Sequence, residues 1–314
     1  MKFTDLQNQV IELVHKGENR EALLVMEEGK ASFPQKRDRL CHWKANIYVM
    51  DGKQEEALAE LNDALENGFW WNPEILTSDP ELKSLRTSPE FQRLVAQCLT
   101  IFEAEKEAAQ VELEVQGNPK ADTVIFPLHW KGSNGKEFAL QWTDEKIGSK
   151  YFLGFPQSSQ LFSYQCYSWD DAALASKDVR RMYHQFEKDY NVSRKKMILA
   201  GASQGGNIAT QMSLNADVEE CDQFIAIVPA FDLDALEEVI RTRLNPNVRG
   251  CIITGDKDPF YEGVMEAVQL FEKNNISCKL IVKEGMGHTL PDDFPNVLDE
   301  AVRFVTNSVT QNLL

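Results

Sequence analysis

A candidate nucleophile, Ser203, stands in the stretch 201–206, which reads Gly-Ala-Ser-Gln-Gly-Gly. The apolar run 196–200 before it is typical of a buried strand, and 207–214 after it has apolar residues at helical spacing. In the pattern Gly-x-Ser-x-Gly, the glycines allow a sharp turn from strand to helix that exposes the serine oxygen. The start of that helix also offers free N–H groups to whatever the serine attacks. The pattern therefore predicts a nucleophilic serine.

A serine is a weak nucleophile without a base, and after such a turn the acid and then a histidine follow in the chain. His288 is the only histidine C-terminal to Ser203. It follows the strand-like run 278–282 and has a glycine directly before it, so its ring can swing over the serine. We therefore predict His288 as the base.

The acid is expected in the segment Gly255-Asp256-Lys257-Asp258-Pro259, which follows the strand-like run 250–254. Functional loops of α/β sheets lie at the carboxyl ends of strands. Asp258 is our first choice and Asp256 the alternative, although either could instead form an Asx turn or cap a helix. Asp232 and Asp234 come one strand too early and are expected to cap a helix.

Together these motifs resemble the phospholipase/carboxylesterase family of α/β-hydrolases, which includes the acyl-protein thioesterases. The resemblance covers about residues 111–310. It rests on the segments Phe155-Pro156-Gln157-Ser158-Ser159-Gln160, Trp169-Asp170-Asp171, Gly201-Ala202-Ser203-Gln204-Gly205-Gly206, Gly255-Asp256-Lys257-Asp258-Pro259 and Gly287-His288. It implies a Ser203–His288–Asp258 triad that cleaves a small-molecule ester or thioester through an acyl-enzyme intermediate.

The chain departs from that family at the oxyanion hole, the pair of N–H donors that stabilises the tetrahedral intermediate. The backbone N–H of Gln204 is expected to be one donor. The family usually has His-Gly after its first core strand, whereas here His129 is followed by Trp130. Because tryptophan adopts glycine's conformations only at a cost, the second donor is left open between Trp130 and Lys131. Trp130 is also expected to narrow the acyl pocket.

Composition indicates an intracellular protein without cofactors. The six cysteines are scattered and none stands at metal-ligand spacing, so we expect free thiols, no metal and no cofactor. The N-terminus does not read as a signal peptide, and no apolar run approaches the ~20 residues that span a bilayer. The net charge of −16, with acidic residues in excess in both halves, argues against nucleic acid as a partner. A cytoplasmic location follows.

The first hundred residues have helical periodicity and an internal echo. The heptapeptide 17–23, Gly-Glu-Asn-Arg-Glu-Ala-Leu, recurs with changes at 52–58 as Gly-Lys-Gln-Glu-Glu-Ala-Leu. This spacing is close to the roughly 34-residue period of tetratricopeptide repeats. We therefore predict a tetratricopeptide-like helical domain over 1–104, which could bind a protein partner, with helices over 3–16, 18–31, 36–50 and 54–66. Trp70 and Trp71 are expected in its core.

The remaining residues, 105–314, are predicted to form an α/β-hydrolase domain with a mostly parallel central sheet. Strands are expected near 111–115, 123–129, 150–155, 196–201, 223–228, 250–254 and 278–283. Helices are expected near 171–190, 205–215, 261–274 and 294–309, with one more short helix between 132 and 148. The favoured function is a metal-independent serine hydrolase. The alternatives are a peptidase-like hydrolase of this fold, which lacks a propeller domain here, and an interaction scaffold whose hydrolase fold is degenerate at Trp130.

Overall fold

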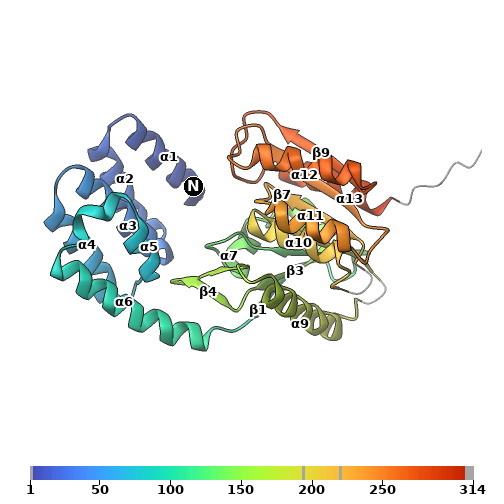
Figure 1. Ribbon diagram of the computed structural model, residues 1–314, viewed down its shortest axis with the longest axis horizontal. Helices are drawn as coiled ribbons and strands as arrows, with labels where there is room; N and C mark the ends of the chain where they lie inside the picture. The colour runs from blue at the N-terminus through green and yellow to red at the C-terminus, as the bar shows by residue number, and fades with distance from the viewer. Residues whose placement is uncertain (1–2, 193–194, 219–220, 308–314) are drawn as a thin grey trace, which may run out of the picture. The chain divides into compact units, whose positions relative to one another are not determined.

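The computed structural model describes residues 3–192, 195–218 and 221–307, and the chain forms two compact units (Figure 1). The first unit comprises Met1–Ala108 and the second Ala109–Leu314. The first is entirely helical among its described residues, and the second contains a seven-stranded sheet. A helical region followed by a mostly parallel sheet is the predicted fold class, which is confirmed.

The helical unit begins with two helical hairpins, at the places where the periodicity predicts four helices. These are α1 (Phe3–His15), α2 (Asn19–Ser32), α3 (Arg37–Met50) and α4 (Gln54–Glu66). The glycines of the sequence echo, Gly17 and Gly52, occupy the turns of the two hairpins and both have φ of +76°. Glycine takes this left-handed conformation without the steric cost of a Cβ, so each helix can end there. The echo in the sequence is therefore an echo in local structure.

The unit also contains the short helices η1 (Pro34–Lys36), α5 (Pro73–Ser78) and η2 (Glu81–Leu85) and the longer helix α6 (Pro89–Ala108). The predicted domain boundary, after residue 104, lies inside α6. Trp70 and Trp71 are buried, and the indole N–H of Trp71 donates to the carbonyl of Asp38. A buried indole needs such an acceptor. The interpretation of these tryptophans as core residues is confirmed.

The sheet of the second unit is parallel except at one edge. Its strands, in spatial order, are β1 (Glu112–Gly117), β3 (Phe152–Gln157), β2 (Thr123–Leu128), β6 (Lys196–Ala202), β7 (Gln223–Ile227), β8 (Arg249–Gly255) and β9 (Ser277–Lys283). Only β1 runs antiparallel to its neighbour, β3. All seven strands match sequence predictions. Loops after β6, β8 and β9 therefore emerge at the same edge of the sheet.

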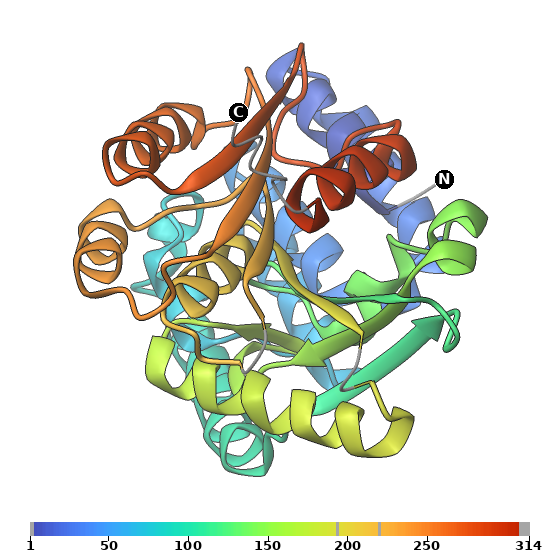
Figure 2. The same cartoon turned by 90° about the vertical axis from the view of Figure 1, so that its right-hand side faces the viewer.

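Alternation along the strands divides the core between the two faces of the sheet, because successive side chains point in opposite directions. On one face, β6 presents Ile198 and Ala200 to α7 (Gly135–Leu140), α8 (Glu145–Lys150) and α13 (Phe294–Thr306). On the other, it presents Met197 and Leu199 to α9 (Ala172–Tyr190) and α10 (Gln204–Leu214). The second face also carries α11 (Leu233–Thr242) and α12 (Tyr261–Lys273). Figure 2 shows the helices on both sides of the twisted sheet.

Three details differ from the sequence predictions. The interval 132–148 contains α7 and the start of α8, where one helix was expected. A small hairpin of β4 (Gln160–Ser163) and β5 (Cys166–Ser168) was not predicted. Its strands are too short to show a clear alternation. The last predicted helix is present as α13, and positions 308–309 of that prediction lie outside the described residues.

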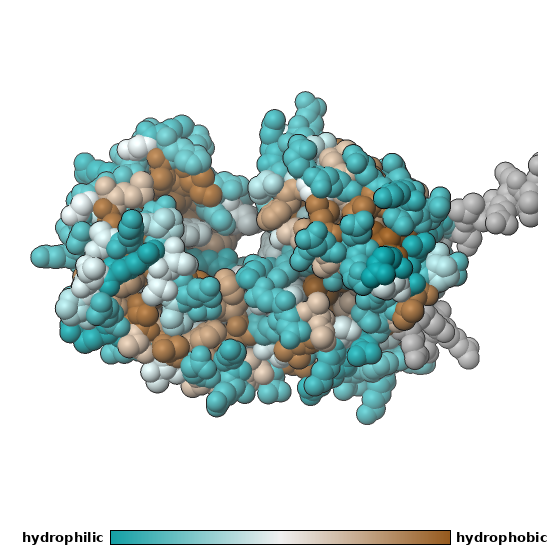
Figure 3. Space-filling view, in the orientation of Figure 1, coloured by the Kyte–Doolittle hydropathy of each residue, from teal (hydrophilic) through white to brown (hydrophobic). Residues whose placement is uncertain are grey.

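Figure 3 shows hydrophilic residues spread over the visible face of each unit, with hydrophobic residues between them. None of the described helices combines the length and apolarity needed to cross a membrane. All six cysteines are unpaired, and five of them are buried.

Candidate active site

The turn between β6 and α10 holds Ser203 in a strained backbone conformation. Its φ is 54° and its ψ −120°, a combination that residues other than glycine rarely adopt. Backbone hydrogen bonds hold it there: the N–H of Ser203 donates to the carbonyl of Ile227, and its own carbonyl accepts from Ala230 and Asn207. The side chain lies at the carboxyl edge of the sheet and is 8% exposed. This is the geometry predicted for a nucleophile elbow.

Two glycines allow the elbow to close. A Cβ on Gly201 would lie 2.3 Å from the backbone of Gly205, and one on Gly205 would lie 2.3 Å from the carbonyl oxygen of Leu128. Any side chain at either position would therefore push α10 away from β6 or β2. The close approach brings the first turn of α10 against the end of β2, where the loop 129–133 begins.

Beyond β8 and β9, Asp258 and His288 form a hydrogen-bonded pair. His288 Nδ1 lies 2.8 Å from Asp258 Oδ2, and Asp258 is only 5% exposed. The other carboxylate oxygen, Oδ1, accepts the backbone N–H of Phe260 at 2.7 Å. Both oxygens of Asp258 are thus fixed, so its carboxylate orients the imidazole, whose side chain is 29% exposed. Within the described residues no hydrogen bond joins Ser203 Oγ to His288.

The loop that carries His288 is attached to the loop after β8. The N–H of Asp256 donates to the carbonyl of Lys283, and that of Lys257 to the carbonyl of Met286. Asp256 Oδ1 accepts the N–H of Gly285 at 2.6 Å. Asp256 therefore contacts backbone of the histidine loop, whereas Asp258 contacts the imidazole itself. Of the two aspartates that the sequence offers, Asp258 is therefore the one that pairs with His288.

On the other side of Ser203, the loop after β2 is built on a buried histidine. His129 is fully buried, and burial lowers its pKa to about 4, against the effect of its hydrogen bond to Trp130. Its Nδ1 lies 2.9 Å from the carbonyl of Trp130, and its Nε2 faces the backbone N–H of Ser158 at 3.4 Å. A neutral ring protonated on Nδ1 satisfies both neighbours, since a carbonyl only accepts and an N–H only donates.

The tryptophan in the place of the family's glycine does not need a glycine conformation. Trp130 has a negative φ, and the positive φ in this loop, +77°, falls on Gly132. The ring of Trp130 packs against Phe138, with centroids 5.6 Å apart. The replacement of glycine by tryptophan therefore imposes no backbone strain that would prevent this loop from supplying an N–H donor.

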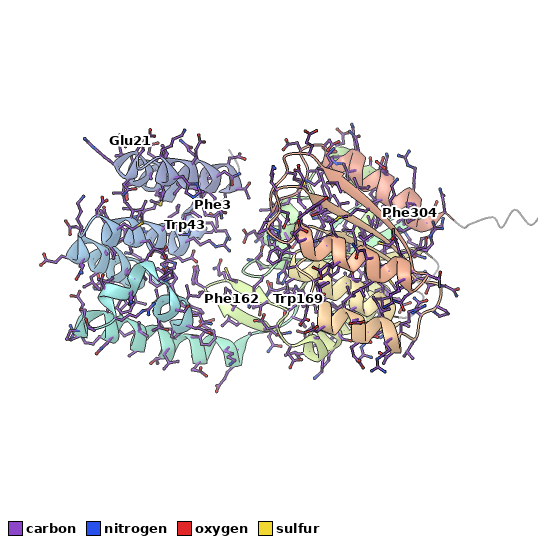
Figure 4. The ribbon with its side chains drawn as sticks, turned by 45° about the horizontal axis from the view of Figure 1, so that its top comes forward. Phe3, Glu21, Trp43, Phe162, Trp169 and Phe304 are labelled. Atoms are coloured by element: carbon purple, nitrogen blue, oxygen red, sulfur yellow. The ribbon has the colours of Figure 1, made fainter. Side chains whose placement is uncertain are left out.

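The segment after β5 connects this loop with the elbow. The indole N–H of Trp169 donates to the carbonyl of His129 at 2.8 Å, and its backbone N–H donates to Gln204 Oε1, also at 2.8 Å. Asp170 Oδ1 accepts from Gln204 Nε2 at 2.8 Å and from Lys131 Nζ at 2.7 Å. We refer to Trp169 and Asp170 as the clamp. Figure 4 labels Trp169, and also Phe162, above whose ring Lys131 Nζ lies at 4.9 Å from the centroid.

The structure thus brings the predicted site residues to one edge of the sheet. Asp232 instead caps α11, where it accepts the N–H of Ala235 as expected. Two features were missed. Phe260 places its ring 5.2 Å from that of His288, and Asp170 bridges two residues far from it in the chain. The motif Trp169-Asp170-Asp171 was the available signal for the second, but a motif does not reveal its partners.

Comparison with known proteins agrees with this fold. Residues 2–109 match the family model described as the A/B hydrolase-like N-terminal domain. An uncharacterized protein from Bacillus cereus ATCC 10987 is 24% identical, with 98% of this chain and 99% of that chain covered and a TM-score of 0.53. No curated protein sequence matches the chain.

Other solved structures resemble only part of the chain. Esterase PE8 is 19% identical over 62% of this chain and 97% of its own, with a TM-score of 0.49. Acyl-protein thioesterase 2 of Zea mays is 13% identical over 63% of this chain and 99% of its own, also with a TM-score of 0.49.

Proposed function

We propose that this protein is a serine hydrolase that cleaves carboxylic esters or thioesters, with Ser203, His288 and Asp258 as its triad. The observation that carries the proposal is the strained elbow at Ser203, with the Asp258–His288 pair beyond the same sheet edge. A serine held at a costly φ and a histidine oriented by a buried carboxylate are the two parts that nucleophilic acyl transfer needs.

In the proposed reaction, Ser203 Oγ attacks the acyl carbon while His288 Nε2 takes the hydroxyl proton. His288 then gives this proton to the leaving alcohol or thiol, which departs and leaves an acyl-serine ester. Water, activated by His288, hydrolyses that ester and restores the serine. Asp258 keeps Nδ1 of the imidazole protonated throughout and stabilises the imidazolium that forms in each half-reaction.

The backbone N–H of Gln204, at the start of α10, is the first proposed oxyanion donor. It has no acceptor among the described residues, as expected for the first N–H of a helix. The developing negative charge also gains from the positive end of the α10 dipole.

The proposed second donor is Lys131 rather than Trp130. In a trans peptide the carbonyl and the N–H point in opposite directions. The carbonyl of His129 points to the clamp and to Gly205, so the N–H of Trp130 is directed away from α10. The carbonyl of Trp130 points to the buried His129 ring, which directs the N–H of Lys131 out of the core. This geometry supports Lys131.

We further propose that helices α1 to α4 form two tetratricopeptide-like hairpins that bind a protein partner. The matching turns at Gly17 and Gly52, thirty-five positions apart, support the repeat. The alternative of an interaction scaffold rested on Trp130 as a sign of a degenerate hydrolase fold. The ordinary backbone conformation of Trp130 removes that argument.

The proposal is tested by assaying the full chain against p-nitrophenyl esters of increasing acyl length and a matched series of acyl-CoA thioesters. We expect turnover of one of the two series, with a burst of p-nitrophenol or CoA equal to the enzyme concentration where deacylation is slow. Absence of turnover across both series would contradict the proposal.

A further inference from the structure

Each of the two proposed oxyanion donors belongs to a residue whose side chain meets the same carboxylate. Lys131 Nζ and Gln204 Nε2 both donate to Asp170 Oδ1, at 2.7 and 2.8 Å. The second oxygen, Oδ2, accepts from Ser168 Oγ at 2.8 Å. Partial burial raises the pKa of Asp170, but the three hydrogen bonds together hold it below its ordinary value, so the group is ionised at neutral pH. The carboxylate is therefore a charged link between the two donors.

Trp169, the other residue of the clamp, also connects the loop 129–133 with Gln204. Trp169 donates its indole N–H to the carbonyl of His129 and its backbone N–H to Gln204 Oε1. The tryptophan is 1% exposed and packs on the His129 ring, with centroids 4.8 Å apart. Two adjacent residues from one strand end thus contact both segments from which the donors come, through four separate hydrogen bonds.

This double attachment matters because oxyanion stabilisation depends on where the donors point before the reaction starts. Preorganised donors act at full strength, whereas donors that must first move lose part of their effect. The loop 129–133 and the helix α10 belong to different strand ends, β2 and β6. Backbone hydrogen bonds with Tyr167 attach the loop to β5, and the hydrogen bonds that connect it with Gln204 run through the clamp.

We propose that Asp170 is a positioning residue that fixes the separation of the two oxyanion donors through the side chains of Lys131 and Gln204. The inference rests on the proposed hydrolase function and names a residue which supports that function without touching the substrate. The position of Lys131 above the ring of Phe162 adds a further restraint on the same side chain.

The test compares Asp170→Ala with Asp170→Asn, measured as kcat and KM on the best ester of the substrate series. The alanine variant loses all three hydrogen bonds, and we expect kcat to fall by about 10- to 100-fold, less than the 10²–10³ that deletion of a donor costs. The asparagine variant keeps an acceptor oxygen for Gln204 but ends the ion pair with Lys131, and we expect a loss of about 3- to 10-fold. KM should change by less than about 3-fold in both.

A second readout follows the oxyanion itself. Ser203 Oγ adds to the carbonyl carbon of an alkyl trifluoromethyl ketone, its proton passes to His288, and the ketone oxygen becomes an oxyanion in the proposed hole. The inhibition constant should rise in each variant by the same factor by which kcat falls, because both report on that charge. Lys131→Met combined with Asp170→Ala should cost little beyond Asp170→Ala alone, because the ion pair that Lys131→Met removes is already lost in Asp170→Ala.

Glu238→Ala is the matched control, because it removes a carboxylate that pairs with Arg241 at 2.6 Å on α11. It should leave kcat and the inhibition constant unchanged. The proposal is overturned if Asp170→Ala keeps wild-type kcat and ketone affinity, or if the loss lies in KM alone. If the alanine variant does not fold, the asparagine variant decides by the same criteria. A wild-type protein without esterase activity would instead overturn the proposed function.

Discussion

The two flanks of Ser203 are held in different ways. On the acid–base flank, Asp258 is buried and accepts a backbone N–H, and the histidine loop is attached by backbone hydrogen bonds from Asp256 and Lys257. On the oxyanion flank, backbone hydrogen bonds with Tyr167 attach the loop 129–133 to β5. Its link to Gln204 runs through the side chains of Lys131 and Asp170, which are 44% and 52% exposed. Exposed pairs are weaker and more easily altered than buried contacts. The proposed base is thus held by buried and backbone contacts, whereas the link between the two proposed oxyanion donors depends on replaceable side chains.

The largest effect is expected at Ser203, which both flanks serve. Ser203→Ala should lower kcat by about 10⁴- to 10⁶-fold, because the two half-reactions pass through its oxygen. Ester turnover and the circular dichroism spectrum of the purified variant provide the check. A variant that folds normally and keeps more than a few per cent of the activity would show that the nucleophile is another residue.

The next largest effect separates the two aspartates of the acid–base flank. Asp258→Asn should lower kcat by about 10⁴-fold, since an amide favours the wrong tautomer of His288. Asp256→Asn should cost less than about 10-fold, because its amide oxygen can still accept the N–H of Gly285.

Steady-state rates of the two variants, measured side by side, give the ranking. A larger loss at Asp256 would transfer the role of the acid to that residue. Equal and mild losses would mean that neither aspartate orients the base.

A smaller effect, on stability, is expected for the buried histidine of the oxyanion flank. Burial lowers the pKa of His129 to about 4, whereas the unfolded chain should have the ordinary value of about 6.5. As the pH falls, the unfolded state therefore binds a proton on this histidine before the folded state does. The share of the free energy of unfolding that depends on neutral His129 is complete above pH ~6.5 and is lost toward pH ~4. Between pH 7 and pH 5 the loss should be about 2 kcal/mol.

His129→Gln removes this titration. The drop in the free energy of unfolding between pH 7 and pH 5 should therefore be smaller in the variant by about 2 kcal/mol. Urea denaturation of both proteins at pH 7 and pH 5 measures the difference. The same pH dependence in the two proteins would mean that His129 takes up a proton in the folded state.

The smallest effect is expected at Phe260. Its backbone N–H holds Asp258, and this bond survives in Phe260→Ala, although the ring beside His288 is lost. We expect kcat to change by less than about 5-fold, with a shift in the preferred acyl length because 43% of this residue is exposed beside the base. The p-nitrophenyl ester series measures both quantities. A collapse of kcat would show that the ring, rather than the backbone, orients the pair.

The sequence predicts the framework of the molecule well because burial imposes periodicity. The strand ending at Ala202 is an apolar run, and the helix over 172–190 has apolar residues at helical spacing. Both elements can therefore be predicted from the sequence. The turn at Gln165, with a φ of 47° between the short strands β4 and β5, gives no comparable signal. Short hairpins are set by tertiary contacts that one sequence does not display.

The candidate site divides along the same lines. Ser203, Asp258 and His288 could be proposed from their order and from the strands before them. The contacts of Asp170 could not, because they join residues 34 and 39 positions away whose geometry depends on the folded sheet. The conformation of Trp130 was likewise unreadable, since a residue's φ is settled by the loop around it.

The central claim is that Ser203 is a nucleophile activated by the Asp258–His288 pair. The most direct measurement is the reaction of the full chain with a fluorophosphonate, followed by intact mass spectrometry and peptide mapping. We expect one adduct per chain, on the peptide containing Ser203, and labelling at least about 10²-fold slower in Asp258→Asn. No adduct, or an adduct on another residue at the same rate in both proteins, would contradict it.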